Sequence, residues 1–94
     1  MVPKMYGVYS RKEIALARAD AILMQLEKQT NNPVNGYEGG YNHGTKFLKY
    51  SDYSGGNFRV RVHATKHNFK KLSGATSRIN TLYKRILQER GLRE

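Results

Sequence analysis

The sequence contains no cysteine, and it has no apolar run of the roughly 18 residues that a membrane-spanning helix needs. Without cysteine there is neither a disulfide framework nor a Cys-based zinc site, so packing alone must hold the fold together. Residues 1–6 lack the apolar core of a signal peptide. We therefore expect a cytoplasmic protein that makes no membrane contact.

Acidic residues are also scarce, and none lies between Asp52 and Glu89. The chain has 17 Lys and Arg against 7 Asp and Glu, a formal net charge of +10, and ten basic and two acidic residues give residues 57–94 a charge of +8. Such a density of charge repels itself, and it is tolerated most easily when a polyanion neutralises it. The expected partner is nucleic acid, RNA or DNA, either bare or within a ribonucleoprotein, and less often an acidic protein surface.

The length of 94 residues predicts one small domain, 1–94, with an α+β fold. A helix is expected at residues 11–29, where apolar residues recur at helical spacing. Ser10 and Glu13 have the spacing of a capping box at its start. Residues 5–9 are rich in aromatics and predict an additional edge strand before this helix.

Residues 33–44 contain four glycines and predict a loop rather than a helix or a central strand. This loop is either a plain connector or a binding element. In the second interpretation the rings of Tyr37 and Tyr41 stack on bases, while backbone amides next to the glycines approach phosphate.

The segment of about 45–65 predicts an antiparallel hairpin, which with the edge strand forms a small antiparallel sheet. Its two strands are joined by a turn at Gly55–Gly56. In residues 57–65 apolar and polar residues alternate, so one face of the strand packs and the other is cationic. Lys46 or Lys49 then lies beside this cationic face, depending on the register. The polar face consists of Arg59, Arg61, His63 and Thr65.

The last segment predicts a basic C-terminal helix with two alternative starts. One start lies after Asn68, and the other lies near Ser73 or Ser77, because Ser73–Gly74 is a plausible break. Gly91 ends the helix, after which residues 92–94 are expected to fray.

The predicted binding surface combines the cations of the hairpin and of the last helix. Lys70 and Lys71 are expected at the start of that helix, where free amides and the helix dipole favour an anion. The predicted contact residues are Arg59, Arg61, His63, Lys66, Lys70, Lys71, Arg78 and Arg85, with Tyr37 and Tyr41 as secondary contacts.

No metal site and no cofactor are predicted. His63 and His67 are four residues apart, but the first lies in a predicted strand and the second in a turn, so the helical pairing of metal ligands does not apply. A metal-independent ribonuclease of toxin type is an alternative, with His63 exchanging protons and Arg59 and Arg61 holding the phosphate. We assign no catalytic residue.

Three functions therefore stay open. The first is a non-enzymatic module that binds nucleic acid, with RNA or a single strand slightly preferred because the short chain has seven tyrosines. The second is the ribonuclease. The third is a small inhibitor or accessory protein, of the kind that mobile elements carry, whose basic face occupies a nucleic-acid channel or an acidic surface of a larger complex.

Overall fold

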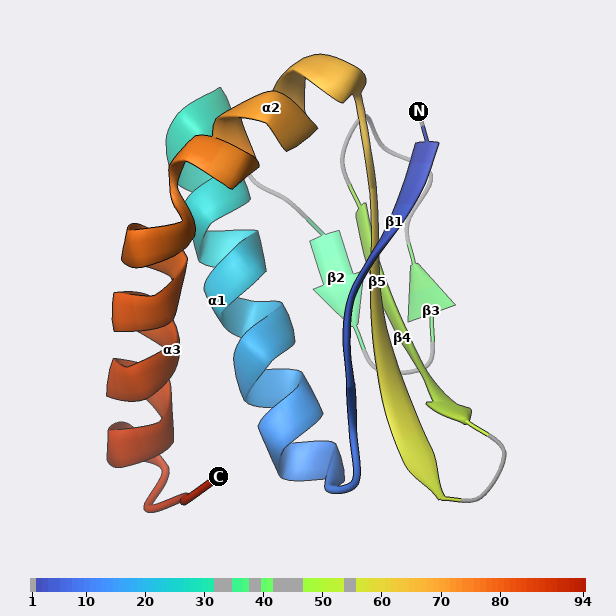
Figure 1. Ribbon diagram of the computed structural model, residues 1–94, viewed down its shortest axis with the longest axis vertical. Coiled ribbons are helices and arrows are strands. Elements are labelled where there is room, and N and C mark those ends of the chain that lie inside the picture. The colour runs from blue at the N-terminus through green and yellow to red at the C-terminus, as the bar shows by residue number, and fades with distance from the viewer. Residues whose placement is uncertain (1, 32–34, 38–39, 42–46, 54–55) are drawn as a thin grey trace.

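The structure is a computed structural model that describes residues 2–31, 35–37, 40–41, 47–53 and 56–94. It confirms an α+β fold (Figure 1). In chain order the elements are β1 (Val2–Tyr9), α1 (Lys12–Thr30), β2 (Asn35–Tyr37), β3 (Gly40–Tyr41), β4 (Phe47–Tyr53), β5 (Asn57–Ala64), α2 (Lys66–Gly74) and α3 (Thr76–Glu89).

The sheet has five strands in the order β1-β5-β4-β2-β3. The β4–β5 hairpin and the edge strand β1 are both antiparallel to their neighbours, as the sequence predicts. The sheet is nevertheless mixed, because β2 runs parallel to β4. Strands β2 and β3 fall within 33–44, where the sequence predicted a loop. They are three and two residues long, respectively, and are held by backbone pairing, in which Gly36 and Gly40 take part.

Helix α1 lies between α3 and the sheet (Figure 1). It runs antiparallel to α3, while α2 crosses the end of the molecule where α1 stops and α3 starts. A helix covered on two sides needs small side chains, and α1 meets this need with four alanines that are almost completely buried. They are Ala15, Ala17, Ala19 and Ala21.

The core lies between β5 and the helices. Val60, Val62 and Ala64 of β5 are fully buried, and Ile22 and Leu26 of α1 pack in the same cluster. Burying a side chain of this size stabilises the fold by about 1.5–3 kcal/mol. The three described helices all lie on this side of the sheet, so the alternate residues of β5 point to the opposite face (Figure 1).

Strand β1 contains a bulge between Met5 and Gly7. The extra residue, Tyr6, lies on the helix side, where its ring stacks on Phe69 of α2 with centroids 6.3 Å apart. Burial raises the pKa of the Tyr6 hydroxyl. Beyond the bulge the register sets Val8 opposite Arg59, so Met5 and Val8 share the face that carries the β5 cations.

The start of α1 corrects one prediction. Its N-cap is Arg11, and no side chain caps the helix, so the capping box of Ser10 and Glu13 does not form. The reason is that β1 continues to Tyr9, which pairs with Phe58, and the chain then uses Ser10 and Arg11 to turn. The end of α1 is at Asn31, which adopts the left-handed conformation with φ 55°.

The C-terminal segment forms two helices with a break at Ala75, close to the break predicted at Ser73–Gly74. The first of them starts earlier than either predicted start, because the Thr65 hydroxyl accepts a hydrogen bond from the Asn68 amide at 3.1 Å and caps α2. Gly91, with φ 67°, ends α3 as predicted. Leu92 then donates its amide to the Leu87 carbonyl and packs against the core, so it does not fray.

Candidate nucleic-acid interface

The first group of predicted site residues lies on the sheet face that points away from the helices. Arg59, Arg61 and His63 alternate along β5 with the buried core residues, and all three are half-buried. We call these three residues the sheet-face cluster. Neither Arg59 nor His63 is free of interactions with neighbouring groups. The register also sets Lys49 of β4 opposite Arg61, whereas Lys46 lies outside the described residues.

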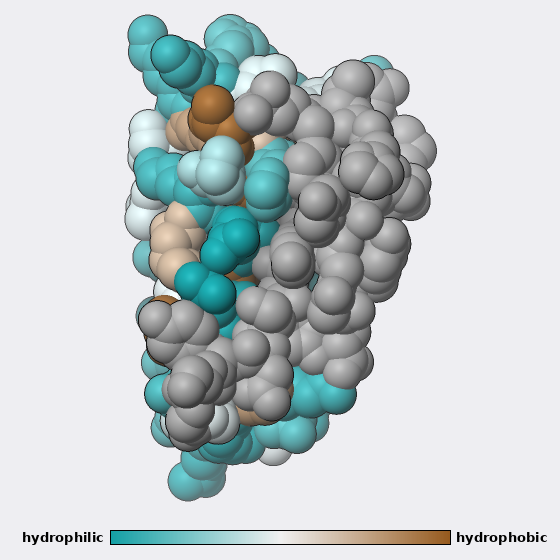
Figure 2. Space-filling view, turned by 90° about the vertical axis from the view of Figure 1, so that its right-hand side faces the viewer, coloured by the Kyte–Doolittle hydropathy of each residue, from teal (hydrophilic) through white to brown (hydrophobic). Residues whose placement is uncertain are grey.

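Apolar side chains border this cluster. Met5 and Val8 of β1 are 45% and 51% exposed, and they pair with Arg61 and Arg59. In Figure 2, which looks onto this side of the molecule, the coloured surface shows hydrophobic patches interspersed with hydrophilic ones. The described part of this face is therefore mixed in character rather than uniformly cationic.

The second group lies on α2. Phe69 and Leu72 are buried and anchor the helix to the core, so Lys66, Lys70 and Lys71 point outward and are exposed. Because α2 begins at Lys66, only that lysine lies in the first turn. Lys70 and Lys71 therefore do not lie at the free amides of the helix start, as the sequence analysis expected.

Helix α2 is fixed to the end of α1 by a side-chain contact. The Gln29 amide nitrogen donates to the carbonyl oxygen of Asn68 at 3.0 Å. The contact holds the α2 lysines close to the last turns of α1, where Lys28 is also exposed.

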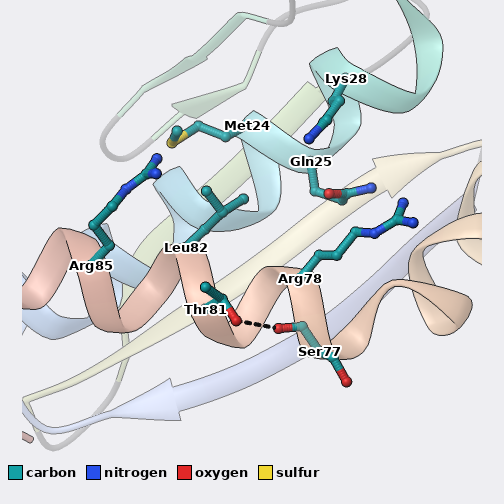
Figure 3. A pocket seen from close by; sticks show the side chains of 8 residues that line it. All are labelled: Met24, Gln25, Lys28, Ser77, Arg78, Thr81, Leu82 and Arg85. Carbon is teal, nitrogen blue, oxygen red and sulfur yellow. Dashed lines mark hydrogen bonds between the residues drawn. The ribbon is translucent and has the colours of Figure 1, made fainter.

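The third group lies on α3, facing α1. Arg78 and Arg85 are exposed and line a groove between the two helices, with a volume of about 460 Å³ (Figure 3). Lys28 of α1 lines the same groove. Arg85 lies 3.7 Å from Glu89 in an exposed ion pair, which contributes little in water.

The structure therefore divides the predicted site into two surfaces. Five exposed cations gather where α1 ends, α2 crosses and α3 begins, and we call them the helix-end cluster. No hydrogen bond or ion pair links their side chains to any residue within the described ranges. Its members are Lys28, Lys66, Lys70, Lys71 and Arg78. The sheet-face cluster lies on the other side of α1 and β5.

Other cations are used to hold the fold together. The guanidinium of Arg18 lies 3.9 Å from the centroid of the Tyr83 ring and donates to the Asn80 side-chain oxygen at 2.9 Å. Burial, and secondarily the Glu94 carboxylate, raises the pKa of the Tyr83 hydroxyl. Arg90 pairs with Asp20 and links the end of α3 to α1. Basic residues held in this way are poor candidates for ligand contact.

No family model, curated protein or solved structure matches this chain. The functional argument accordingly rests on the residues and their geometry. Within the described ranges, no helix is long and apolar enough to cross a membrane, and no three His, Asp or Glu side chains gather as metal ligands do.

Two site residues were missed by the sequence analysis. The sequence analysis named neither Lys28 nor Gln25 as a site residue, yet both line the groove, and Gln25 is only 3% exposed. For Tyr37 and Tyr41 the structure describes only the backbone, so their stacking on bases stays a prediction.

Proposed function

We propose that this protein binds nucleic acid, RNA or a single strand in preference to duplex DNA, through the helix-end cluster and without catalysis. The observation that supports this proposal is the gathering of five exposed cations, without an ion pair among the described residues, at the end of α1, on α2 and at the start of α3. Four of the five lie on α2 and α3, which carry no acid before Glu89.

Free cations at this density favour a polyanion as partner. Each exposed Lys or Arg that neutralises a phosphate releases a condensed counterion, and this release drives binding without any requirement for sequence. A protein without such a partner carries a repulsive patch that contributes nothing to its fold. Helix α2 crosses the end of the molecule with its lysines pointing outward. The flexible sugar-phosphate backbone of a single strand can follow such a surface.

The test is a titration of fluorescently labelled single-stranded RNA, duplex RNA and duplex DNA at two salt concentrations. We expect the single strand to bind most tightly and to lose affinity as salt rises. Weak binding to all three, insensitive to salt, would contradict the proposal. The RNA is then run on a gel, where shortened RNA would favour the ribonuclease alternative.

A second candidate function follows from the sheet-face cluster. The exposed apolar residues Met5 and Val8 next to Arg59 and Arg61 suit a protein surface that offers both apolar and acidic groups. In that case the chain is an accessory protein or inhibitor of a larger complex. Retained partner binding by a variant without helix-end lysines would favour this candidate.

A further inference from the structure

The groove between α1 and α3 has the size of a small-molecule site, at about 460 Å³. Figure 3 shows that its side chains come from both helices, with Gln25 and Lys28 on α1 facing Arg78 on α3. Met24, Leu82 and Arg85 form the other end of the groove.

One buried amide oxygen at this groove has no hydrogen-bond partner among the described residues. The Oε1 atom of Gln25 is buried and accepts no hydrogen bond from any described residue. A buried polar group without a partner is unfavourable, so its presence calls for a ligand or water that donates to it. The terminal torsion of a glutamine side chain is soft, so a small rotation turns its amide toward a ligand.

A side-chain amide is well suited to a nucleobase. It offers a donor and an acceptor in one plane, and glutamine reads the adenine edge through such a pair of hydrogen bonds. The aliphatic surface next to it suits the flat face of the base, because Met24 is 38% exposed and Leu82 is half-buried.

Cations on both sides of the groove are positioned to contact the phosphates next to a bound base. Lys28 and Arg78 lie beside Gln25, and Arg85 lies at the Met24 end, so cations flank the apolar surface on both sides. Lys28 and Arg78 also belong to the helix-end cluster. A strand that follows this cluster therefore passes the mouth of the groove.

We propose that the groove receives one base of a bound single strand, with the base edge at Gln25, the base face on Met24 and Leu82, and the neighbouring phosphates on Lys28, Arg78 and Arg85. This inference rests on the nucleic-acid binding proposed above, and it adds a preference for strands that carry bases, adenine above the others.

The test compares oligoadenylate with a fully abasic strand of the same length and charge, using fluorescence anisotropy. Wild type should prefer the base-bearing strand. Gln25→Leu should reduce this preference by about three- to tenfold, the value of one or two hydrogen bonds, with little change in affinity for the abasic strand. The matched control is Gln88→Leu on the exposed side of α3, which should leave the preference unchanged.

The outcomes separate the two proposals. If wild type binds neither strand, the nucleic-acid function fails and the groove fails with it. If both strands bind but wild type does not distinguish them, or Gln25→Leu keeps the full preference, the groove alone is wrong. Photocrosslinking of an oligoadenylate strand that carries 8-azidoadenosine needs no variant: crosslinks at Met24 or Leu82 support the groove, and crosslinks confined to β5 overturn it.

Discussion

The sheet-face cluster and the helix-end cluster both consist of basic residues, but in opposite surroundings. Arg59, Arg61 and His63 rise from a strand whose other face is the core, and they are half-buried beside apolar neighbours. The helix-end cations stand on the outer sides of helices and are exposed. The comparison teaches that a count of positive charges does not distinguish cations available to a polyanion from cations that are part of a packed surface.

The difference has a physical origin in the two types of element. A central strand presents each side chain between neighbours about 4.8 Å away on either side, which cover its stem. A short helix anchored by one buried stripe leaves the remaining side chains surrounded by water. Fully hydrated lysines lose little on approaching phosphate in a salt-dependent, non-specific complex.

The largest expected effect concerns salt. If the helix-end cluster and Arg85 contact six phosphates of a single strand, log Kd should change with log salt with a slope of about 4 in magnitude, at about 0.7 per contact. The affinity should then fall by roughly 250-fold between 50 and 200 mM salt. A slope near zero in anisotropy titrations would mean that neither cluster binds by charge.

The next largest effect is expected from charge reversals, which test directly which of the two clusters binds nucleic acid. Lys70→Glu with Lys71→Glu should weaken binding to single-stranded RNA by roughly a hundredfold. Each substitution replaces an attraction to phosphate by a repulsion, which costs about 1.4 kcal/mol of binding free energy, or about tenfold in affinity. Arg59→Glu with Arg61→Glu changes the same number of charges on the sheet face and should change the affinity by less than about threefold. If the second pair has the larger effect, the binding surface is the sheet face.

The two clusters should also differ in how much their side chains contribute to the stability of the fold. Arg59→Ala should lower the free energy of unfolding by about 1–2 kcal/mol, since the residue is half-buried and engaged with its neighbours. Lys70→Ala, at an exposed position, should change it by less than about 0.5 kcal/mol. Urea unfolding followed by circular dichroism measures both, and equal values would remove the distinction between the two clusters.

The smallest effect is a gain in stability. Gln25→Leu replaces a buried amide without a partner by an apolar side chain of similar shape, which should stabilise the free protein by about 1 kcal/mol. Gln88→Leu is the control on an exposed surface and should have almost no effect. Destabilisation by Gln25→Leu would show that the amide is satisfied in solution.

Local patterns made part of this structure predictable. The alternation along β5 and the helical spacing in α1 depend on neighbouring residues only, and both elements were found where the sequence placed them. The start of α2 was missed because Thr65 was assigned to the preceding strand, although its hydroxyl caps the helix. The site was harder to predict, since nothing in the sequence near Gln25 or Lys28 reveals that they line a groove with α3.

The division of the cations into two surfaces could not be predicted, because it depends on how α3 packs on α1. One residue hints at that packing. Ala21 lies one turn before Gln25, on the same side of α1, and it is fully buried. Small residues next to an apparent solvent face indicate a second contact, but they do not say which element makes it.

Ala21 lies on the side of α1 that faces α3, because Arg18, one turn before it, stacks on Tyr83 of α3, and Gln25, one turn after it, lines the groove. We infer that its small buried methyl group lets the two helices approach closely, and that a larger side chain there would push them apart. The depth of the groove at Gln25, one turn further, is thus determined by a residue that never meets a ligand. Variation at this alanine would tune what the groove admits, so homologous chains with valine or serine here should differ in ligand preference while keeping every charged residue.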